Sequence, residues 1–179
     1  MRAFVAVEIC NDGLLESIAR LQSEMQIKAS PVSKKNMHFT LLFLGEISEE
    51  ASEDVKKALS GIVFSPIQVS FTHVGAFPKP DFPRVIWIGV DEDSGRKLVE
   101  LARQVEQRLA PLGFKADKPF KPHLTIFRVR NRDDAMAGRL ARYGKVSLGT
   151  DTVSELKFKQ SVLTSNGPVY SDLLVVKAQ

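Results

Sequence analysis

The chain has 179 residues, of which 44% are hydrophobic and 26% charged, with a formal net charge of +4. This composition is typical of a soluble globular protein, and no segment approaches the ~18 apolar residues that span a bilayer. The single cysteine, Cys10, excludes an internal disulfide and favours a reducing compartment, so we expect a cytoplasmic protein.

Hydrophobic patterns in the first half predict strand, helix, strand, helix and strand, in that order. The start of the chain is predicted to be a strand and not a signal peptide, because Glu8 interrupts it and no small-residue cleavage site follows. The predicted strands are Arg2–Ile9, Met37–Leu44 and Ile67–Ala76, and the helices follow caps at Asn11 or Asp12 and at Ser48.

The second half repeats this order. It contains a strand at Val85–Val90, a turn at Asp91–Gly95, a helix from about Arg96 to Leu109, a strand at His123–Val129, a short helix between Asp133 and Gly144, and a hairpin turn at Asn166–Gly167. We therefore expect one α+β domain with a duplicated strand-helix-strand-helix-strand unit. Its two lobes, about 1–80 and 81–179, should pack intimately against each other.

Two copies of a short motif carry the chemistry of the chain, His38-Phe39-Thr40-Leu41 and His123-Leu124-Thr125-Ile126. Successive side chains in a strand point to opposite faces, so each His should share a face with its Thr. The third histidine, His73, has no Thr two positions later, and we expect a structural role for it.

Basic residues concentrate around the second motif. Residues 91–179 carry 16 basic and 11 acidic side chains, against 9 and 10 in residues 1–90. No acid lies between Asp117 and Asp133, a stretch that contains Lys118, Lys121, Arg128, Arg130 and Arg132. Such a field attracts phosphate, although a basic run can also be a solvated surface without a ligand.

Two imidazoles and two hydroxyls suit displacement at phosphorus. One His can take a proton from the attacking oxygen while the other gives a proton to the leaving oxygen, and Thr hydroxyls can hold the anionic oxygens. No metal site is expected, since there is one Cys and the acids lie outside both motif strands. The P-loop, dinucleotide and G-x-S-x-G patterns are also missing, so we expect no cofactor.

The two motifs and their flanks resemble those of the two-histidine (2H) phosphoesterase superfamily. Further similarity to the RNA 2′,3′-cyclic phosphodiesterase branch, also called 2′-5′ RNA ligase, lies in Arg2-Ala3-Phe4-Val5-Ala6, Phe39–Gly45, Arg84–Gly89 and Pro122–Arg128. The resemblance implies a bilobal fold with two antiparallel sheets around a central, positively lined cleft. It also implies metal-independent opening of a 2′,3′-cyclic phosphate at an RNA 3′ end, to a 2′-phosphate and a free 3′-hydroxyl.

Roles carried over by motif make His123 the general base and His38 the general acid, with Thr40 and Thr125 on the non-bridging oxygens. The sequence leaves an exchange of the two histidines open. The resemblance places Arg128 near the phosphate or terminal nucleotide, although simple alternation puts it on the face opposite His123; a bulge or the strand's end would reconcile the two.

Other functions remain open at this point. The chain could act on small cyclic nucleotides left by tRNA splicing, or bind RNA ends without catalysis. Ligation would be the same chemistry with an RNA 5′-hydroxyl in place of water. ATP-dependent ligation is disfavoured, because no K-x-D-G-type motif is present. The expected partners are RNA 3′ ends, including tRNA fragments, and we expect a monomer that binds no membrane.

Overall fold

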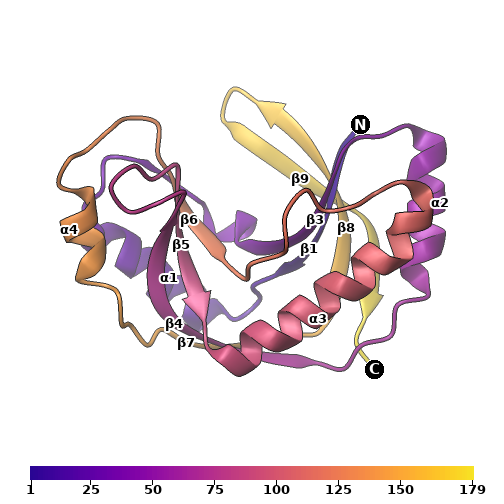
Figure 1. Cartoon of the computed structure of the whole chain (residues 1–179), viewed down its shortest axis with the longest axis horizontal. Helices are drawn as coiled ribbons and strands as arrows, with labels where there is room; N and C mark the ends of the chain where they lie inside the picture. The colour runs from indigo at the N-terminus through magenta and orange to yellow at the C-terminus, as the bar shows by residue number, and fades with distance from the viewer.

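The computed structural model describes all 179 residues, 1–179, and contains two antiparallel sheets (Figure 1). Sheet A has the strand order β3-β1-β8-β9, and sheet B has the order β2-β6-β5-β4-β7. The strands of sheet A are β1 (Arg2–Glu8), β3 (His38–Glu46), β8 (Glu155–Thr164) and β9 (Gly167–Lys177). Those of sheet B are β2 (Ser30–Pro31), β4 (Ile67–Phe77), β5 (Val85–Val90), β6 (Leu124–Arg128) and β7 (Gly149–Val153).

The two sheets are built in the same way from the two halves of the chain. In sheet A the first strand of the first half, β1, pairs with the motif strand β3, and in sheet B the corresponding pair is β5 and β6. The fourth strand of each half crosses to the other sheet, so that β8 pairs with β1 and β4 pairs with β5. The expected α+β fold with a duplicated unit is therefore confirmed, and each sheet contains strands of both halves. The lobe boundary near residue 80 stays a prediction.

Four α-helices connect the strands: α1 (Asp12–Met25), α2 (Glu49–Ser60), α3 (Glu92–Leu109) and α4 (Met136–Ala141). Two 3₁₀ turns lie at Lys34–Asn36 and Ala110–Leu112. The side chains of Asn11 and Ser48 accept hydrogen bonds from the backbone NH groups at the starts of α1 and α2, as N-caps do.

The predicted turn at Asp91–Gly95 is wrong. The Asp91 side chain accepts a hydrogen bond from the backbone NH of Ser94 at 3.0 Å and so starts α3 at Glu92, with Gly95 inside the helix. The predicted hairpin exists, but its two turn residues are Ser165 and Asn166, one position earlier than expected. Gly167 follows with a φ of 105°, a value that favours glycine.

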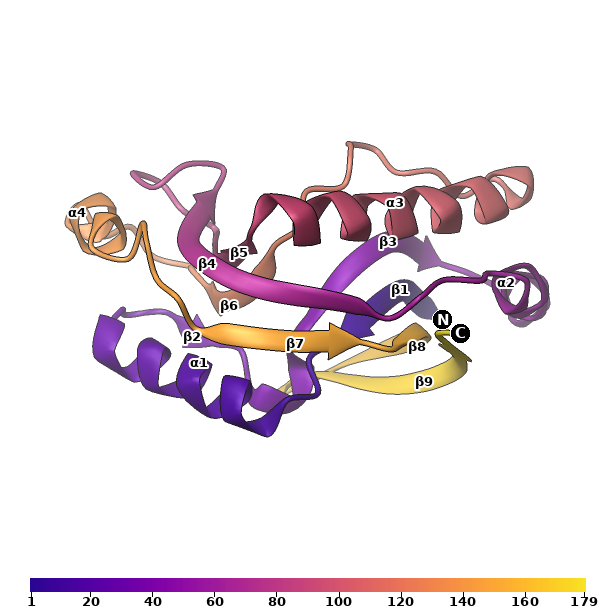
Figure 2. The ribbon, with the colours of Figure 1, turned by 90° about the horizontal axis from the view of Figure 1, so that it is seen from below.

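A single hydrophobic core of 41 buried residues runs through the molecule. The helix α3 contacts β3 of sheet A and β4 of sheet B, so it joins the two sheets, whereas α1 packs against β7. Figure 2 shows α3 and α1 on opposite sides of the molecule. One core shared by both sheets holds the two motif strands in a fixed relative position. None of the helices combines the length and the apolar character that crossing a membrane requires.

Candidate active site

The two motif strands meet, although they belong to different sheets. His38 is the first residue of β3, His123 directly precedes β6, and β3 contacts β6. Burial is the main cause of the lowered pKa of both histidines, and the positive charge of Arg128 lowers each pKa further. The fold therefore brings His38 and His123 to one place. We use the name two-histidine site for these two residues together with Thr40, Thr125 and Arg128.

Both imidazoles are oriented by the same backbone contact. The Nδ1 atom of His38 donates to the carbonyl oxygen of Asn36 at 2.8 Å, and Nδ1 of His123 donates to that of Lys121 at 2.6 Å. A carbonyl oxygen can only accept, so the proton of each neutral ring sits on Nδ1. Each Nε2 then carries a lone pair and makes no hydrogen bond within the protein, which leaves two proton acceptors ready for a substrate.

Burial keeps both rings neutral near pH 7. It lowers the pKa of His38 to about 4 and that of His123 below its usual 6.5. Phe4 and Tyr170 pack against the His38 ring, with centroids 5.2 and 5.4 Å away. Phe77 packs edge-on against the His123 ring at 4.9 Å. The deeper burial of His38 makes it the harder of the two to protonate.

The two threonines lie on the same faces as their histidines. In the β1–β3 pairing Thr40 is opposite Ala6 and His38 opposite Glu8, so Thr40 and His38 share a face. Thr125 stands opposite Trp87, two positions after His123. Neither threonine hydroxyl is hydrogen-bonded within the protein, so each can donate to a bound anion.

A bulge directly after the Thr of each motif brings one more residue onto the face that carries the His and Thr. The register of β3 against β1 skips Leu41, and again Leu44 further on, and that of β6 against β5 skips Ile126. An extra residue reverses the alternation of the residues that follow it. Arg128 therefore faces the same way as Thr125, and Phe43 faces the same way as Thr40.

Phe43 is a residue that the sequence reasoning missed. Its side chain is 69% exposed, which is unusual for a large aromatic in a strand. It lies five positions after His38, just as Arg128 lies five positions after His123. This matching offset in the two copies was the signal that could have found it.

The surroundings of the two histidines differ in character. Beside His38, the ammonium groups of Lys157 and Lys159 form ion pairs with Glu8 and Asp172, and Lys157 lies 2.5 Å from Glu8. This cluster carries two positive and two negative charges. Lys159 is 4% exposed, so its charge is held away from solvent, whereas the side chain of Asp172 is 33% exposed.

Beside His123 the neighbours are aromatic. Trp87 lies 6.4 Å from the His123 ring and 5.0 Å from Phe77, and its buried Nε1 has no hydrogen-bond partner. His73 packs edge-on against Trp87 at 5.6 Å, and its Nδ1 lies 3.0 Å from the hydroxyl oxygen of Thr72. His73 thus lies behind Trp87 and takes no part in the two-histidine site.

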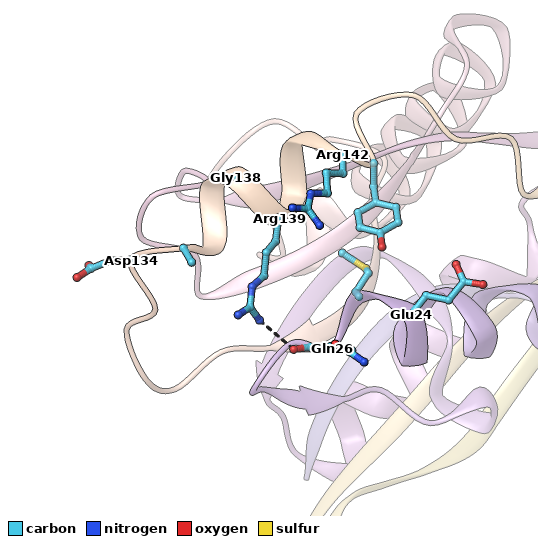
Figure 3. Close-up of a pocket in the computed structure, with 9 residues that line it drawn as sticks. Glu24, Gln26, Asp134, Gly138, Arg139 and Arg142 are labelled. Atoms are coloured by element: carbon cyan, nitrogen blue, oxygen red, sulfur yellow. Dashed lines mark hydrogen bonds between the residues drawn. The ribbon is translucent and has the colours of Figure 1, made fainter.

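A hollow of about 620 Å³ lies elsewhere, between α1 and α4 (Figure 3). Arg139 and Arg142 line it together with Glu24 and Asp134, so its charges balance. Arg139 donates to the carbonyl oxygen of Gln26 at 2.9 Å and ties α4 to the end of α1. No motif residue lines this hollow. The chain also has no group of three or more His, Cys, Asp or Glu residues that could hold a metal ion.

Comparisons with known proteins agree with this architecture. The model of the family described as LigT like Phosphoesterase matches the chain twice, over residues 7–87 and 88–170. A curated relative from Archaeoglobus fulgidus is 42% identical and covers 98% of this chain and 99% of its own length; one from Methanocaldococcus jannaschii is 35% identical, with 95% and 96% covered. Both carry the name RNA 2′,3′-cyclic phosphodiesterase.

Solved structures share the whole fold. The crystal structure of TT0787 of Thermus thermophilus has a TM-score of 0.81 at 26% identity, and covers 99% of this chain and 97% of that one. Escherichia coli LigT complexed with 3′-AMP has a TM-score of 0.80 at 22% identity, with 99% and 98% covered. Two consecutive family matches, full-length relatives above 30% identity and a shared fold show that this chain belongs to the LigT-like phosphoesterases, a family of two-histidine enzymes.

Proposed function

We propose that this protein hydrolyses the 2′,3′-cyclic phosphate at RNA 3′ ends to a 2′-phosphate and a 3′-hydroxyl, without a metal ion. The observation that carries the proposal is the pair of imidazoles from two sheets, each with Nδ1 held by a backbone carbonyl and Nε2 left free. The activity named for its relatives at 42% and 35% identity supports it.

One imidazole accepts a proton from water at Nε2 as water attacks phosphorus. The other enters the step as an imidazolium, protonated at Nε2 and stabilised by the anionic phosphate, and gives this proton to O3′ as the P–O3′ bond breaks. Thr40 and Thr125 donate their free hydroxyls to the two non-bridging oxygens. The guanidinium of Arg128 adds positive charge where negative charge develops. The five-membered cyclic phosphate is strained, so positioned acid-base chemistry is sufficient.

The motif-based assignment makes His123 the base and His38 the acid. The deeper burial of His38 supports the exchanged assignment, because an imidazole with a pKa of about 4 is almost fully unprotonated at pH 7. A substrate with sulfur in place of O3′ separates the two, since a thiolate leaves without a proton. The variant that lacks the acid, His38→Ala or His123→Ala, recovers activity on this substrate, and the variant that lacks the base does not.

The exposed ring of Phe43 offers a face on which the terminal base can stack. With an RNA 5′-hydroxyl in place of water the same groups would join two RNA ends through a 2′-5′ linkage, and abundant water makes hydrolysis dominate. We further propose a monomer that acts in the cytoplasm, with tRNA fragments among its substrates. Activity on small cyclic nucleotides is the second candidate, and a comparison of rates on oligonucleotides and mononucleotides separates it.

The test is incubation of an oligoribonucleotide with a 2′,3′-cyclic end in EDTA, with analysis of the product. We expect the wild-type protein to form the 2′-phosphate as fast in the presence of EDTA as in its absence. Each of the variants His38→Ala and His123→Ala should lose turnover and still bind the oligonucleotide, which separates catalysis from binding. Loss of activity in EDTA that a divalent ion restores, or full activity in both variants, would contradict the proposal.

A further inference from the structure

A small basic hollow lies directly beside the two-histidine site. It has a volume of about 220 Å³ and is lined by Lys28, Ala29, Ser30, Arg128, Arg130 and Asn131. Three of these six side chains are cationic, and none is a carboxylate. Here the term basic hollow means this set of residues.

The cations of the basic hollow have no counter-ion in the protein. Lys28, Arg128 and Arg130 form no ion pair, whereas Arg132, two residues further on, lies 2.6 Å from Asp134. Like charges gathered around one hollow repel each other, and a bound anion relieves this repulsion. An uncompensated cluster of this kind indicates a site for an anion rather than a structural ion pair.

Backbone pairing fixes the basic hollow relative to the reaction centre. In the β2–β6 ladder Ser30 stands opposite Arg128, and this pairing holds Lys28 near the end of β6. Arg128 belongs to both places, because it lines the hollow and shares a face of sheet B with Thr125. An anion in the hollow therefore lies next to the phosphate that the histidines would process.

We infer that the basic hollow binds the phosphodiester between the last two nucleotides of an RNA chain. This inference rests on the proposed function and makes the substrate an oligonucleotide rather than a mononucleotide. An RNA end carries its next phosphate one nucleotide from the cyclic phosphate, and Arg128 spans the two positions. A free phosphate ion carries the same charge and the same hydrogen-bond acceptors as an RNA phosphodiester. The experiment below distinguishes between these two ligands.

The experiment uses the full-length protein and three substrates: a cyclic mononucleotide, a dinucleotide with a 2′,3′-cyclic end, and the same dinucleotide with a neutral methylphosphonate at its internal linkage. The test variant is Lys28→Ala with Arg130→Ala. Both side chains are exposed, so folding should be unaffected. The control variant, Lys57→Ala with Arg103→Ala, removes the same charge from α2 and α3.

For the wild type we expect kcat/KM to be on the order of tenfold higher for the charged dinucleotide than for the methylphosphonate. The test variant should lose this difference, keep the wild-type kcat/KM on the mononucleotide, and show a weaker salt dependence of kcat/KM for the charged dinucleotide. The control variant should behave as the wild type.

The two proposals fail in different ways. If the wild type opens the cyclic end but prefers neither dinucleotide, or if the test variant keeps the preference, the phosphodiester site is wrong and the proposed function stands. An equal loss on all three substrates would also overturn the site. A further result would also overturn the site: millimolar inorganic phosphate changes mononucleotide turnover in the wild type but not in the test variant. The basic hollow would then bind a free phosphate ion and not the RNA chain. If the wild type opens no cyclic end at all, the proposed function itself is wrong.

Discussion

Thr125 and Arg128 lie on one face of sheet B, although an odd number of positions separates them. Thr125 stands opposite Trp87 and Arg128 opposite Val85, two residues of one face of β5, because Ile126 is skipped in the pairing. The bulge thus places a hydroxyl and a guanidinium side by side next to His123. An equivalent bulge at Leu41 places Phe43 beside Thr40.

Removal of the Arg128 charge should raise the pKa of both motif histidines. The guanidinium disfavours the imidazolium form of His38 and His123, so Arg128→Met relieves this repulsion and both rings protonate at higher pH. The measurement is an NMR titration of the imidazole protons in the wild type and the variant.

The variant Arg128→Lys is the matched control, because it keeps the charge and loses only the planar fork. It should leave both pKa values near those of the wild type. A shift confined to one ring in Arg128→Met would mean that the two histidines do not share one site.

The sequence was sufficient to predict what depends on local pattern. Alternation within a strand placed His38 with Thr40 and His123 with Thr125, and the repeat of the motif predicted the duplicated fold. The orientation of Arg128 was undecided and that of Phe43 was missed, because a bulge is a property of the pairing between two strands. The start of α3 was misjudged for a related reason: Gly95 suggested a turn, but the Asp91 cap and the packing of α3 on both sheets outweigh its low helix propensity.

His38 should make the stability of the protein depend on pH below neutrality. Its pKa falls from 6.5 in the unfolded chain to about 4 in the fold, so the unfolded state binds more protons between these values. The stabilisation is fully present above pH 6.5 and is lost as the pH falls toward 4, in total about 3 kcal/mol.

Urea unfolding at pH 7, 5.5 and 4 measures this effect. The variant His38→Gln should lose less stability than the wild type over this range, since it lacks the group that takes up the proton. Parallel pH curves for the two proteins would mean that His38 titrates normally in the fold.

Lys159 should contribute far more to stability than a surface lysine. It is 4% exposed and pairs with Glu8 and Asp172, so Lys159→Met leaves these two carboxylates with Lys157 alone, and the expected loss is about 1–3 kcal/mol. Lys57 is the control: its side chain is 78% exposed and lies 3.4 Å from Asp54, so Lys57→Met should cost less than about 0.5 kcal/mol. Denaturant titration of both variants is the measurement, and equal losses would contradict the buried ion cluster.

The space at Gly75 should control the position of Trp87 and, through it, of His123. A Cβ atom at Gly75 would overlap the Trp87 ring, so Gly75→Ala forces this ring to move. We expect a loss of about 1–3 kcal/mol from overpacking and a lower kcat, because Trp87 packs beside His123. The chain has one tryptophan, so its fluorescence spectrum reports the displacement directly.

The control is Gly138 in α4, where an added Cβ would meet no atom within 4 Å. The variant Gly138→Ala should therefore gain up to about 1 kcal/mol in the free energy of unfolding and leave fluorescence and turnover unchanged. Wild-type fluorescence and kcat in Gly75→Ala would show that Trp87 does not position His123.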